Sequence, residues 1–359
     1  MAGYVYAGDV GVSGMKVAAP DLQALCEALF ASAGVAPEHA RAWAEVLVWA
    51  NLRGVESHGV LRIPRYLELI ELGQLRPQPE MKWLTRAGAI ALLDADRAPG
   101  PVAMVAAMDE AIARARDVHV GWVVVRDITH AGAVGHFALR AAEQGMVGMV
   151  MTASIPLMAW PGSKGAVLST NPIAVAMPAE GRAPLLLDMA TSQVSNGKVL
   201  AAKDAATVIP TGWGVDEHGA DTTDATKVAT LLPMGGPKGA GLSLMIECLA
   251  SLAASNGVIG PALRGELPKG DIRMNGVAIA LDISAFGDGA AIRREVTALA
   301  DTIKAQPKAP GAEELLMPGE RGDAVKAKRL RDGIPIAKGT WARLAEVAAA
   351  RGVAMPTLL

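Results

Sequence analysis

Six short apolar runs in the middle of the chain restrict the fold more than any other feature. They are residues 89–95, 121–126, 147–153, 171–178, 184–190 and 276–283. Runs of this length between glycines, prolines and polar residues are typical of buried strands. A helical pattern at 133–145 lies between the second and third runs, so residues 121–152 resemble a strand, helix and strand unit. The middle of the chain is therefore predicted to be mixed α/β.

Helical patterns flank this region on both sides. Proline starts and glycine ends predict N-terminal helices at 20–34, 37–54 and 64–73. C-terminal helices are predicted at 290–306, 322–333 and 339–352. A length of 359 residues favours two domains. We expect a helical domain built from 15–85 plus 290–359, and a second domain at 86–289, where glycines and prolines cluster and the chemistry should lie. Residues 1–14 have no helical or strand period and are predicted to be a disordered extension.

Composition narrows the class of partner. The formal net charge is −2, and no block of Lys or Arg alternates with aromatic residues, so we expect no nucleic-acid partner. No apolar run approaches the roughly 20 residues of a membrane span, and no secretory start is visible, which predicts a cytoplasmic protein with no membrane partner. Two cysteines, Cys26 and Cys248, and six scattered histidines predict no metal site. A small-molecule partner is the default expectation.

The stretch at 54–66, "GVESHGVLRIPRY", concentrates groups that handle protons and bind anions. Ser57, His58 and Arg62 are predicted on an ordered loop between two helices, and Tyr66 in the first turn of the helix that starts at Pro64. An ordinary polar connection between helices is the alternative interpretation. Both stay open on the residues alone.

The usual phosphate-binding fingerprints are absent from the sequence. No GxGxxG and no P-loop occurs, and the nearest approximations, at 130–137 and 235–241, have the wrong glycine spacing. "GGPKGAG" can still present backbone amides at a helix start, with Lys238 adding a full positive charge for a phosphate. A tight turn with a solvated lysine is the alternative.

Three further polar positions lie near predicted strand ends. His130 follows the run at 121–126, where it could exchange a proton or cap the next helix. Asp188 ends an apolar run and, if buried, should meet amides, a hydroxyl or a cation; a helix cap and a ligand contact are both possible. Ser154 precedes a segment, 156–172, that is predicted to be plain loop. A GxSxG elbow is lacking, which speaks against hydrolase chemistry.

Six strings in a fixed order carry a resemblance to a known family: "SHGVLRIPRY", "THAGAVGHF", "STNPIAVAMP", "LLLDMATS", "LPMGGPKGAGLSLMIE" and "MPGER". The chain resembles the malate/L-lactate dehydrogenase family of NAD(P)-dependent oxidoreductases from about residue 19 onward. "THAG" and "GGPKG" bring it closest in motifs to the ureidoglycolate dehydrogenases of that family.

The resemblance implies a fold, a cofactor and site residues. The implied fold is a non-Rossmann, largely antiparallel sheet with helices, and the implied assembly is a homodimer with the active site near the subunit interface. The implied catalytic residues are His130 and His58, and the implied substrate contacts are Ser57, Arg62 and Tyr66. The implied contacts to NAD or NADP are Ser154, Asp188, Met189, Ala190, Lys238, Gly319, Glu320 and Arg321.

The expected function is hydride transfer between the nicotinamide and C2 of a small 2-hydroxy or 2-oxo acid, such as malate, lactate or a ureidoglycolate-like acid. Arg62 would hold the carboxylate, and His130, or alternatively His58, would take the hydroxyl proton. Reduction of cyclic imino acids or N-substituted amino acids is one alternative. An inactive cofactor-binding metabolite sensor is an alternative of another class.

Overall fold

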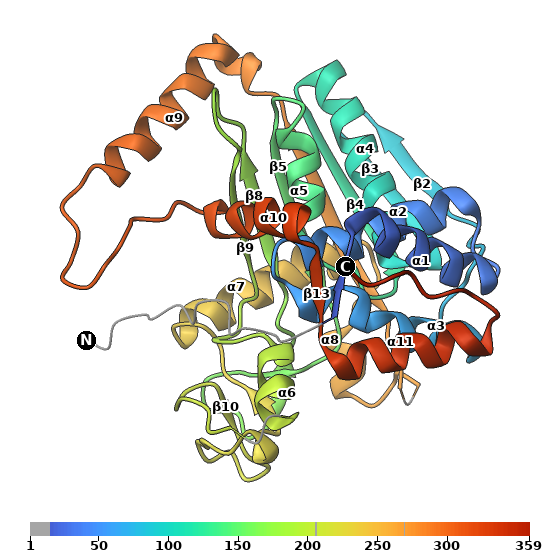
Figure 1. Cartoon of the computed structure of the whole chain (residues 1–359). Coiled ribbons are helices and arrows are strands. Elements are labelled where there is room, and N and C mark those ends of the chain that lie inside the picture. The colour runs from blue at the N-terminus through green and yellow to red at the C-terminus, as the bar shows by residue number, and fades with distance from the viewer. Residues whose placement is uncertain (1–14, 205–206, 269) are drawn as a thin grey trace. The chain divides into compact units, whose positions relative to one another are not determined.

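The structure is a computed structural model that describes residues 15–204, 207–268 and 270–359 (Figure 1). The expected extension at 1–14 lies outside the described residues. The chain divides into two compact units. Unit 1 takes the chain up to Glu71 together with Gly322–Leu359, and unit 2 is Leu72–Arg321. The expected domain limits were 85 and 290, and the compact units change at Glu71 and Gly322 instead.

Unit 1 is mainly helical. Its elements are β1 Met15–Val17, α1 Ala19–Ser32, α2 Pro37–Leu52, the 3-10 turns η1 Glu56–His58 and η2 Val60–Arg62, α3 Ile63–Glu71, β13 Ile334–Ile336, α11 Lys338–Ala350 and most of α10 Glu320–Asp332. Prolines stand in the first turns of α1 and α2, where their missing N–H costs nothing. The three N-terminal helices were predicted to within two residues at each end.

Aromatic packing joins the helices of unit 1. The rings of Phe30 on α1 and Trp43 on α2 stack with centroids 3.9 Å apart, and Tyr66 on α3 lies 5.0 Å from Trp43. The N-terminal and C-terminal segments of unit 1 also pair, because β1 is antiparallel to β13. Two of the three predicted C-terminal helices, α10 and α11, therefore belong with the N-terminal helices, and the third, α9, belongs to unit 2.

A seven-stranded sheet forms the core of unit 2, in the order β2-β3-β4-β12-β5-β8-β9. Its strands are β2 Lys82–Ala87, β3 Ile90–Ala98, β4 Val120–Ile128, β5 Val147–Ala153, β8 Ile173–Met177, β9 Leu185–Met189 and β12 Met274–Leu281. Every neighbouring pair is antiparallel except β3 and β4. The expected largely antiparallel, mixed α/β fold is confirmed.

The predicted strand, helix and strand unit exists in a split form. Strands β4 and β5 flank helix α5, Gly135–Ala142, in sequence, but they do not pair with each other. Strand β12 lies between them and runs antiparallel to both, so β4 and β5 are parallel with one strand inserted. Helix α4, Gly100–Val118, packs on β4 and β12 and was not predicted.

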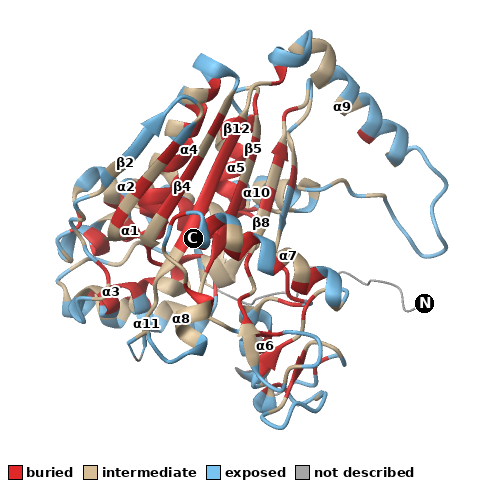
Figure 2. Ribbon diagram, turned by 180° about the vertical axis from the view of Figure 1, so that it is seen from behind, coloured by how far each residue is buried: buried red, intermediate tan, exposed pale blue. Residues whose placement is uncertain are grey.

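Residue size separates the two faces of this sheet. A Cβ on Gly121 would lie 2.0 Å from the Ala111 carbonyl of α4, and one on Gly148 would lie 2.1 Å from the Ala138 carbonyl of α5. Glycine therefore allows these helices to touch the strands. The opposite face carries the larger Val124, Met151 and Ile279, which pack against the helix after residue 237. Figure 2 shows the central strands as buried along their length.

The rest of unit 2 consists of short elements. A second sheet has the order β10-β11-β6-β7, with β6 Met158–Ala159, β7 Ala166–Leu168, β10 Gly214–Val215 and β11 Thr230–Leu231. Helical segments are α6 Asn196–Asp204, η3 Ala225–Lys227, α7 Pro237–Glu247, the π-helical turn η4 Cys248–Leu252, α8 Ile259–Leu263, η5 Ile283–Phe286 and α9 Gly289–Lys304. The prediction of plain loop at 156–172 was wrong, because β6 and β7 pair there.

No helix among the described residues combines the length and hydropathy needed to cross a bilayer.

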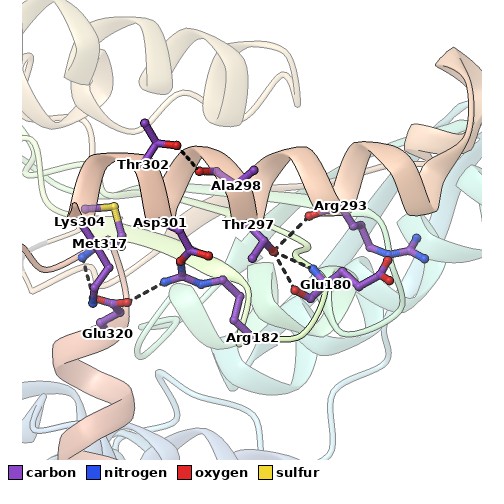
Figure 3. A network of polar contacts seen from close by, with 10 residues as sticks. All are labelled: Glu180, Arg182, Arg293, Thr297, Ala298, Asp301, Thr302, Lys304, Met317 and Glu320. Atoms are coloured by element: carbon purple, nitrogen blue, oxygen red, sulfur yellow. Dashed lines mark hydrogen bonds and ion pairs between the residues drawn. The ribbon is translucent and has the colours of Figure 1, made fainter. Parts of the chain in front are cut away.

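Helix α9 is fixed to unit 2 by polar contacts (Figure 3). Only Ala300 of this helix is buried, and most of its surface is exposed in Figure 2. Thr297 Oγ1 donates to the Glu180 carbonyl at 2.8 Å. At the end of α9, Lys304 Nζ donates to Glu320 Oε2 at 2.6 Å, and Arg182 Nη2 donates to Glu320 Oε1 at 2.6 Å. Glu320 is therefore the charged centre of this attachment.

We expect Glu320→Gln to lower the free energy of unfolding by about 1–2 kcal/mol at pH 7, because two charge-assisted bonds are lost. Burial alone would raise the pKa of Glu320, but Lys304, the Met317 amide and Arg182 together hold it below its ordinary value. A lowered pKa gives stability that is present above the ordinary value and lost as pH falls through the lowered one. In urea unfolding, the difference between the two proteins should therefore begin to shrink as pH falls below about 4.3, the ordinary value for Glu, and should vanish only below the lowered pKa of Glu320.

Asp301→Asn is the matched control for this experiment. Asp301 also contacts Arg182, but at 3.4 Å and with its side chain 69% exposed. Its loss should change the unfolding free energy by less than about 0.5 kcal/mol. Equal effects of the two substitutions, or a Glu320→Gln effect that persists in acid, would contradict the central role of Glu320.

Candidate active site

The loop between α2 and α3 brings Ser57, His58 and Arg62 together in unit 1. It consists of the 3-10 turns η1 and η2 joined at Gly59. Ser57 Oγ lies 2.8 Å from His58 Nδ1. The Nε of Arg62 donates to the Ser57 carbonyl at 2.7 Å, so the guanidinium folds back over the turn that carries the histidine.

The electrostatics of this loop favour an uncharged histidine. Burial, and secondly the positive charge of Arg62, lower the pKa of His58 to about 4. Tyr66 is buried in α3, and burial raises the pKa of its hydroxyl, although Arg62 opposes the shift. The loop therefore presents one fixed cation beside a neutral imidazole and a neutral phenol at pH 7.

Asn51 anchors the loop and was not recognised in the sequence. This residue lies in the last turn of α2 and is only 3% exposed. Its Oδ1 accepts the Val60 amide at 2.8 Å, and a Cβ on Gly59 would lie 2.0 Å from that oxygen. Gly59 is thus the residue that permits the contact. The sequence signal that could have identified Asn51 is its position as the single amide side chain in an otherwise apolar helix end.

In unit 2, hydrogen bonds connect three motifs that are distant in sequence, and the first of these motifs contacts Ser154. Ser154 Oγ lies 2.6 Å from Ser169 Oγ, and its amide donates to Asn171 Oδ1 at 3.3 Å. The Thr191 amide donates to the Thr170 carbonyl at 3.0 Å, and the Met234 amide donates to the Thr191 carbonyl at 2.9 Å. The "STNP", "DMATS" and "PMGG" strings therefore form one polar cluster.

Two buried hydroxyls mark this cluster as a place for a further polar group. Thr191 is fully buried and Thr152 is 1% exposed. Neither Oγ1 has a hydrogen-bond partner among the described residues. Buried hydroxyls without partners are costly in a finished core. Met189 and Ala190 precede Thr191, and Ser154 follows Thr152 by two residues, so both hydroxyls adjoin predicted cofactor contacts.

Asp188 acts as a helix cap in the structure. Its Oδ2 accepts the Gly135 amide, the first of helix α5, at 3.0 Å. A carboxylate at this end of a helix is stabilised by the helix dipole. Asp188 is exposed, so it carries no buried charge that a partner would have to neutralise. Gly135 is required here, because a Cβ would lie 2.5 Å from the carboxylate.

The "GGPKG" string forms the start of helix α7. Gly235 and Gly236 have φ values of 58° and 60°, which glycine adopts without strain. A side chain at Gly236 would meet nothing within 4 Å, so open space adjoins the turn. Lys238 is exposed, and its ammonium has no hydrogen-bond or ion-pair partner in the part of the chain that the structure describes. Helix start, open space and lysine together fit a phosphate.

The "PGER" string lies beside strand β9. The Leu186 amide donates to the Pro318 carbonyl at 3.0 Å, and Gly319, with φ 97°, packs closely on Leu186. Both carboxylate oxygens of Glu320 are taken by Arg182 and Lys304. Arg321 is exposed in the first turn of α10. The carboxylate of Glu320 is thus already paired within the chain by two cations.

His130 lies two residues beyond the end of β4, as predicted. Its Nδ1 accepts the Gly132 amide at 3.2 Å. An acceptor at Nδ1 places the proton of the neutral ring on Nε2.

Within the described residues, no three His, Cys, Asp or Glu side chains are arranged to hold a metal ion.

A profile of the malate/L-lactate dehydrogenase family matches residues 17–345. The malate dehydrogenase of Pyrococcus horikoshii is 37% identical over 330 residues, which cover 89% of this chain and 91% of that protein. Its solved structure superposes with a TM-score of 0.87, covering 96% of this chain and 97% of that one at 32% identity.

Two other similar proteins differ in the names of their substrates. The NAD(+) ureidoglycolate dehydrogenase of Escherichia coli K12 is 35% identical over 324 residues, covering 90% of this chain and 93% of that protein. The solved delta1-piperideine-2-carboxylate reductase of Pseudomonas syringae has a TM-score of 0.81, with 29% identity and coverage of 93% and 99%. These comparisons define an oxidoreductase. The chain belongs to the malate/L-lactate dehydrogenase family, which confirms the expected resemblance.

We expect Arg62→Met to raise the pKa of His58 above about 4, because a neighbouring positive charge is removed. Burial is the larger cause and remains, so the pKa should stay below the ordinary value of about 6.5. The measurement is an NMR titration of the histidine ring nitrogens.

Arg65→Met serves as the control. Arg65 is exposed and pairs with Glu68 at 2.7 Å on the outside of α3. Its replacement should leave the His58 titration unchanged. If Arg62→Met also leaves it unchanged, Arg62 does not set the charge state of this loop.

Proposed function

We propose that the protein transfers a hydride between a nicotinamide cofactor, NAD or NADP, and C2 of a small 2-hydroxy or 2-oxo acid such as malate, lactate or a ureidoglycolate-like acid. The observation that carries the proposal is the Ser57–His58–Arg62 loop, where one guanidinium folds over a neutral imidazole. The named activities of the similar proteins support the same class of substrate.

Arg62 is the proposed carboxylate contact. Its Nε is used by the Ser57 carbonyl, which fixes the plane of the guanidinium. Within the described residues this is its only hydrogen bond, so its two terminal nitrogens have donors for both oxygens of a carboxylate. Ser57 and Tyr66 complete the proposed substrate contacts. A buried phenol with a raised pKa would remain a hydrogen-bond donor across the working pH range.

His58 is the proposed acid–base residue, with His130 as the alternative. To take a hydroxyl proton on Nε2, a histidine must keep its other proton on Nδ1. His58 can do so, because the Ser57 hydroxyl can accept from Nδ1 at 2.8 Å. Nδ1 of His130 already accepts the Gly132 amide, so its Nε2 would carry a proton and act as a donor.

The charge of the substrate would tune this histidine. A pKa of about 4 makes His58 neutral at pH 7 and ready to accept a proton. A carboxylate bound to Arg62 would offset the second cause of the lowered pKa, so the bound complex should hold the accepted proton better than the free protein. Proton transfer would thereby depend on an acidic substrate being in place.

The polar cluster of unit 2 is the proposed cofactor site. Its proposed contacts are Ser154, Asp188, Met189, Ala190, Lys238, Gly319, Glu320 and Arg321. The open start of α7 with Lys238 fits a pyrophosphate, and the unpartnered Thr152 and Thr191 hydroxyls fit polar atoms of the cofactor. Bound there, the cofactor would accept or supply the hydride.

We propose a cytoplasmic location, since both cysteines are free thiols.

Reduction of a cyclic imino acid is the second candidate. The structural similarity to a piperideine carboxylate reductase favours it, and the substrate carries the same carboxylate. Arg62 would act as in the first proposal. The histidine would give a proton to the imine nitrogen instead of an oxygen.

We also propose a homodimer. Helix α7 and turn η4 pack one side on the sheet, yet Met245, Leu249 and Leu252 on the other side are exposed. From residue 237 to 252 the only charges are Lys238 and the buried Glu247. A helix that is apolar on all sides is usually covered. Because this face carries no charge, it can meet a second copy of itself without repulsion.

The wild-type protein should turn over a 2-hydroxy or 2-oxo acid with NAD or NADP, measured by nicotinamide absorbance with 2-oxo acids, cyclic imines and ureidoglycolate. His58→Asn should lower kcat by roughly 100-fold or more, the scale for losing a general acid or base. Cofactor affinity, measured by calorimetry, should be unchanged.

His130→Asn tests the alternative assignment. A loss of turnover confined to His130→Asn would reverse the roles of the two histidines. An imine as the only substrate would select the second candidate. No turnover with any of these compounds and both cofactors would leave the proposed activity wrong.

Leu249→Glu should convert a dimer, of about twice the 37.0 kDa chain mass, into a monomer in multi-angle light scattering. Leu299→Glu on α9, which is also exposed, is the control and should leave the mass unchanged. A monomeric wild type would refute the dimer. Dissociation by Leu299→Glu alone would move the interface to α9.

A further inference from the structure

The loop that carries His58 and Arg62 has little internal support. Each of its two 3-10 turns spans three residues, and neither has a side-chain cap. Among the described residues, the backbone hydrogen bonds of its turns are short-range: the His58 amide donates to the Val55 carbonyl, and the Arg62 amide donates to the Gly59 carbonyl. Short 3-10 turns have poor hydrogen-bond geometry. The position of the two side chains therefore depends on contacts from outside the loop.

Helix α10 supplies one of these contacts through Arg329. This arginine is only 5% exposed. Its Nη1 lies 2.6 Å from Glu56 Oε1, at the first residue of η1, and it also donates to the Asn51 carbonyl at the end of α2. One guanidinium thus joins the helix before the loop to the loop itself.

Asn51 links the same anchor to the far side of His58. The backbone of Asn51 is held by Arg329, and its side chain accepts the Val60 amide. Glu56 and Val60 stand two residues before and two residues after His58. The histidine is therefore held on both sides, by Arg329 through Glu56 before it and by Asn51 through Val60 after it, and the Arg329–Asn51 contact joins the two holds.

The approach of α10 is built into its sequence. A Cβ on Gly322 would lie 2.7 Å from the Arg53 guanidinium, so a larger residue there would have to displace that side chain. Asp323 pairs with Arg53 one residue further along. A buried arginine is costly unless its bonds are satisfied, and an apolar residue would often serve stability equally well. An arginine here is thus better explained by the geometry that it imposes.

We propose that Arg329 is a positioning residue for His58 and Arg62, acting through Glu56 and Asn51. The inference rests on the proposed function and adds residues that hold its acid–base and carboxylate-binding groups in place. Arg329 need not touch the substrate. Both partners contact Nη1 of a rigid, planar guanidinium, and the flexible ammonium of a lysine would not reproduce that placement in full.

Three variants test this role. Arg329→Met removes both contacts, and Arg329→Lys keeps the positive charge. Glu56→Gln changes a side chain that is 42% exposed, so this variant should fold and can serve if the arginine variants do not. We expect kcat/KM to fall roughly 10- to 100-fold in Arg329→Met, the scale for a small misplacement of reacting groups. Arg329→Lys should recover part of that loss, and Glu56→Gln should lie between wild type and Arg329→Met.

Two further readouts separate positioning from stability. Oxalate, an unreactive dicarboxylate, should bind more weakly to the variants in calorimetry, while cofactor affinity stays within about two-fold. All assays are run well below each melting temperature. Asp323→Asn, which breaks another ion pair of α10, is the matched control and should lower the melting temperature without weakening oxalate binding.

The outcomes distinguish this inference from the function beneath it. If the variants lose thermal stability but keep kcat/KM and oxalate affinity, Arg329 is only structural and the inference is wrong. If Asp323→Asn weakens oxalate as strongly as the others, positioning is not specific to Arg329, and the inference is also wrong. If the wild type neither turns over an acid nor binds oxalate, the proposed function fails as well.

Discussion

Strand β12 is the constraint on which unit 2 depends. It comes from residues 274–281, yet it pairs along its length with both β4 and β5, which are more than 120 residues earlier. His130 follows the end of β4, and Ser154 follows the end of β5. The pairing of both strands with β12 therefore fixes the distance between these two residues. Gly276 lets α4 lie against this strand, because a Cβ there would meet the Met104 sulfur at 2.6 Å. Sheet order and helix contact are thus set by one segment.

The elements with strong local signals were the predictable ones. Proline and glycine bounded α1 and α2, and apolar runs marked β4, β5 and β12, because those signals act over a few residues. Placement of β12 between β4 and β5 could not be predicted, since it depends on pairing across long sequence distances. The two-residue strand β6 is too short to show a period. Helix α4 was missed although its pattern is local, so that failure was one of interpretation.

The candidate site divides in the same way. Residue types at 57, 58 and 62 allowed proton and anion chemistry, because histidine exchanges protons near neutral pH and arginine binds carboxylates, but an ordinary polar connection was equally compatible with them. Their support could not be foreseen: Arg329 reaches Asn51 from 278 residues away. Asp188 was expected to meet an amide, with a helix cap as one of two interpretations, and it caps α5. Glu320, which the family pattern associates with the cofactor, also binds Lys304 and Arg182, and no local pattern indicated those partners.

The discontinuity of unit 1 has a consequence for biosynthesis. Its first helices leave the ribosome early, but their partners α10, β13 and α11 follow the whole of unit 2 in the chain. Even the Leu359 amide bonds back to the Lys16 carbonyl, at 2.9 Å. Domains generally form as units during synthesis, so unit 2 can fold while α1–α3 still wait with apolar faces uncovered. The nascent N-terminal helices are therefore the segment with most need of a chaperone.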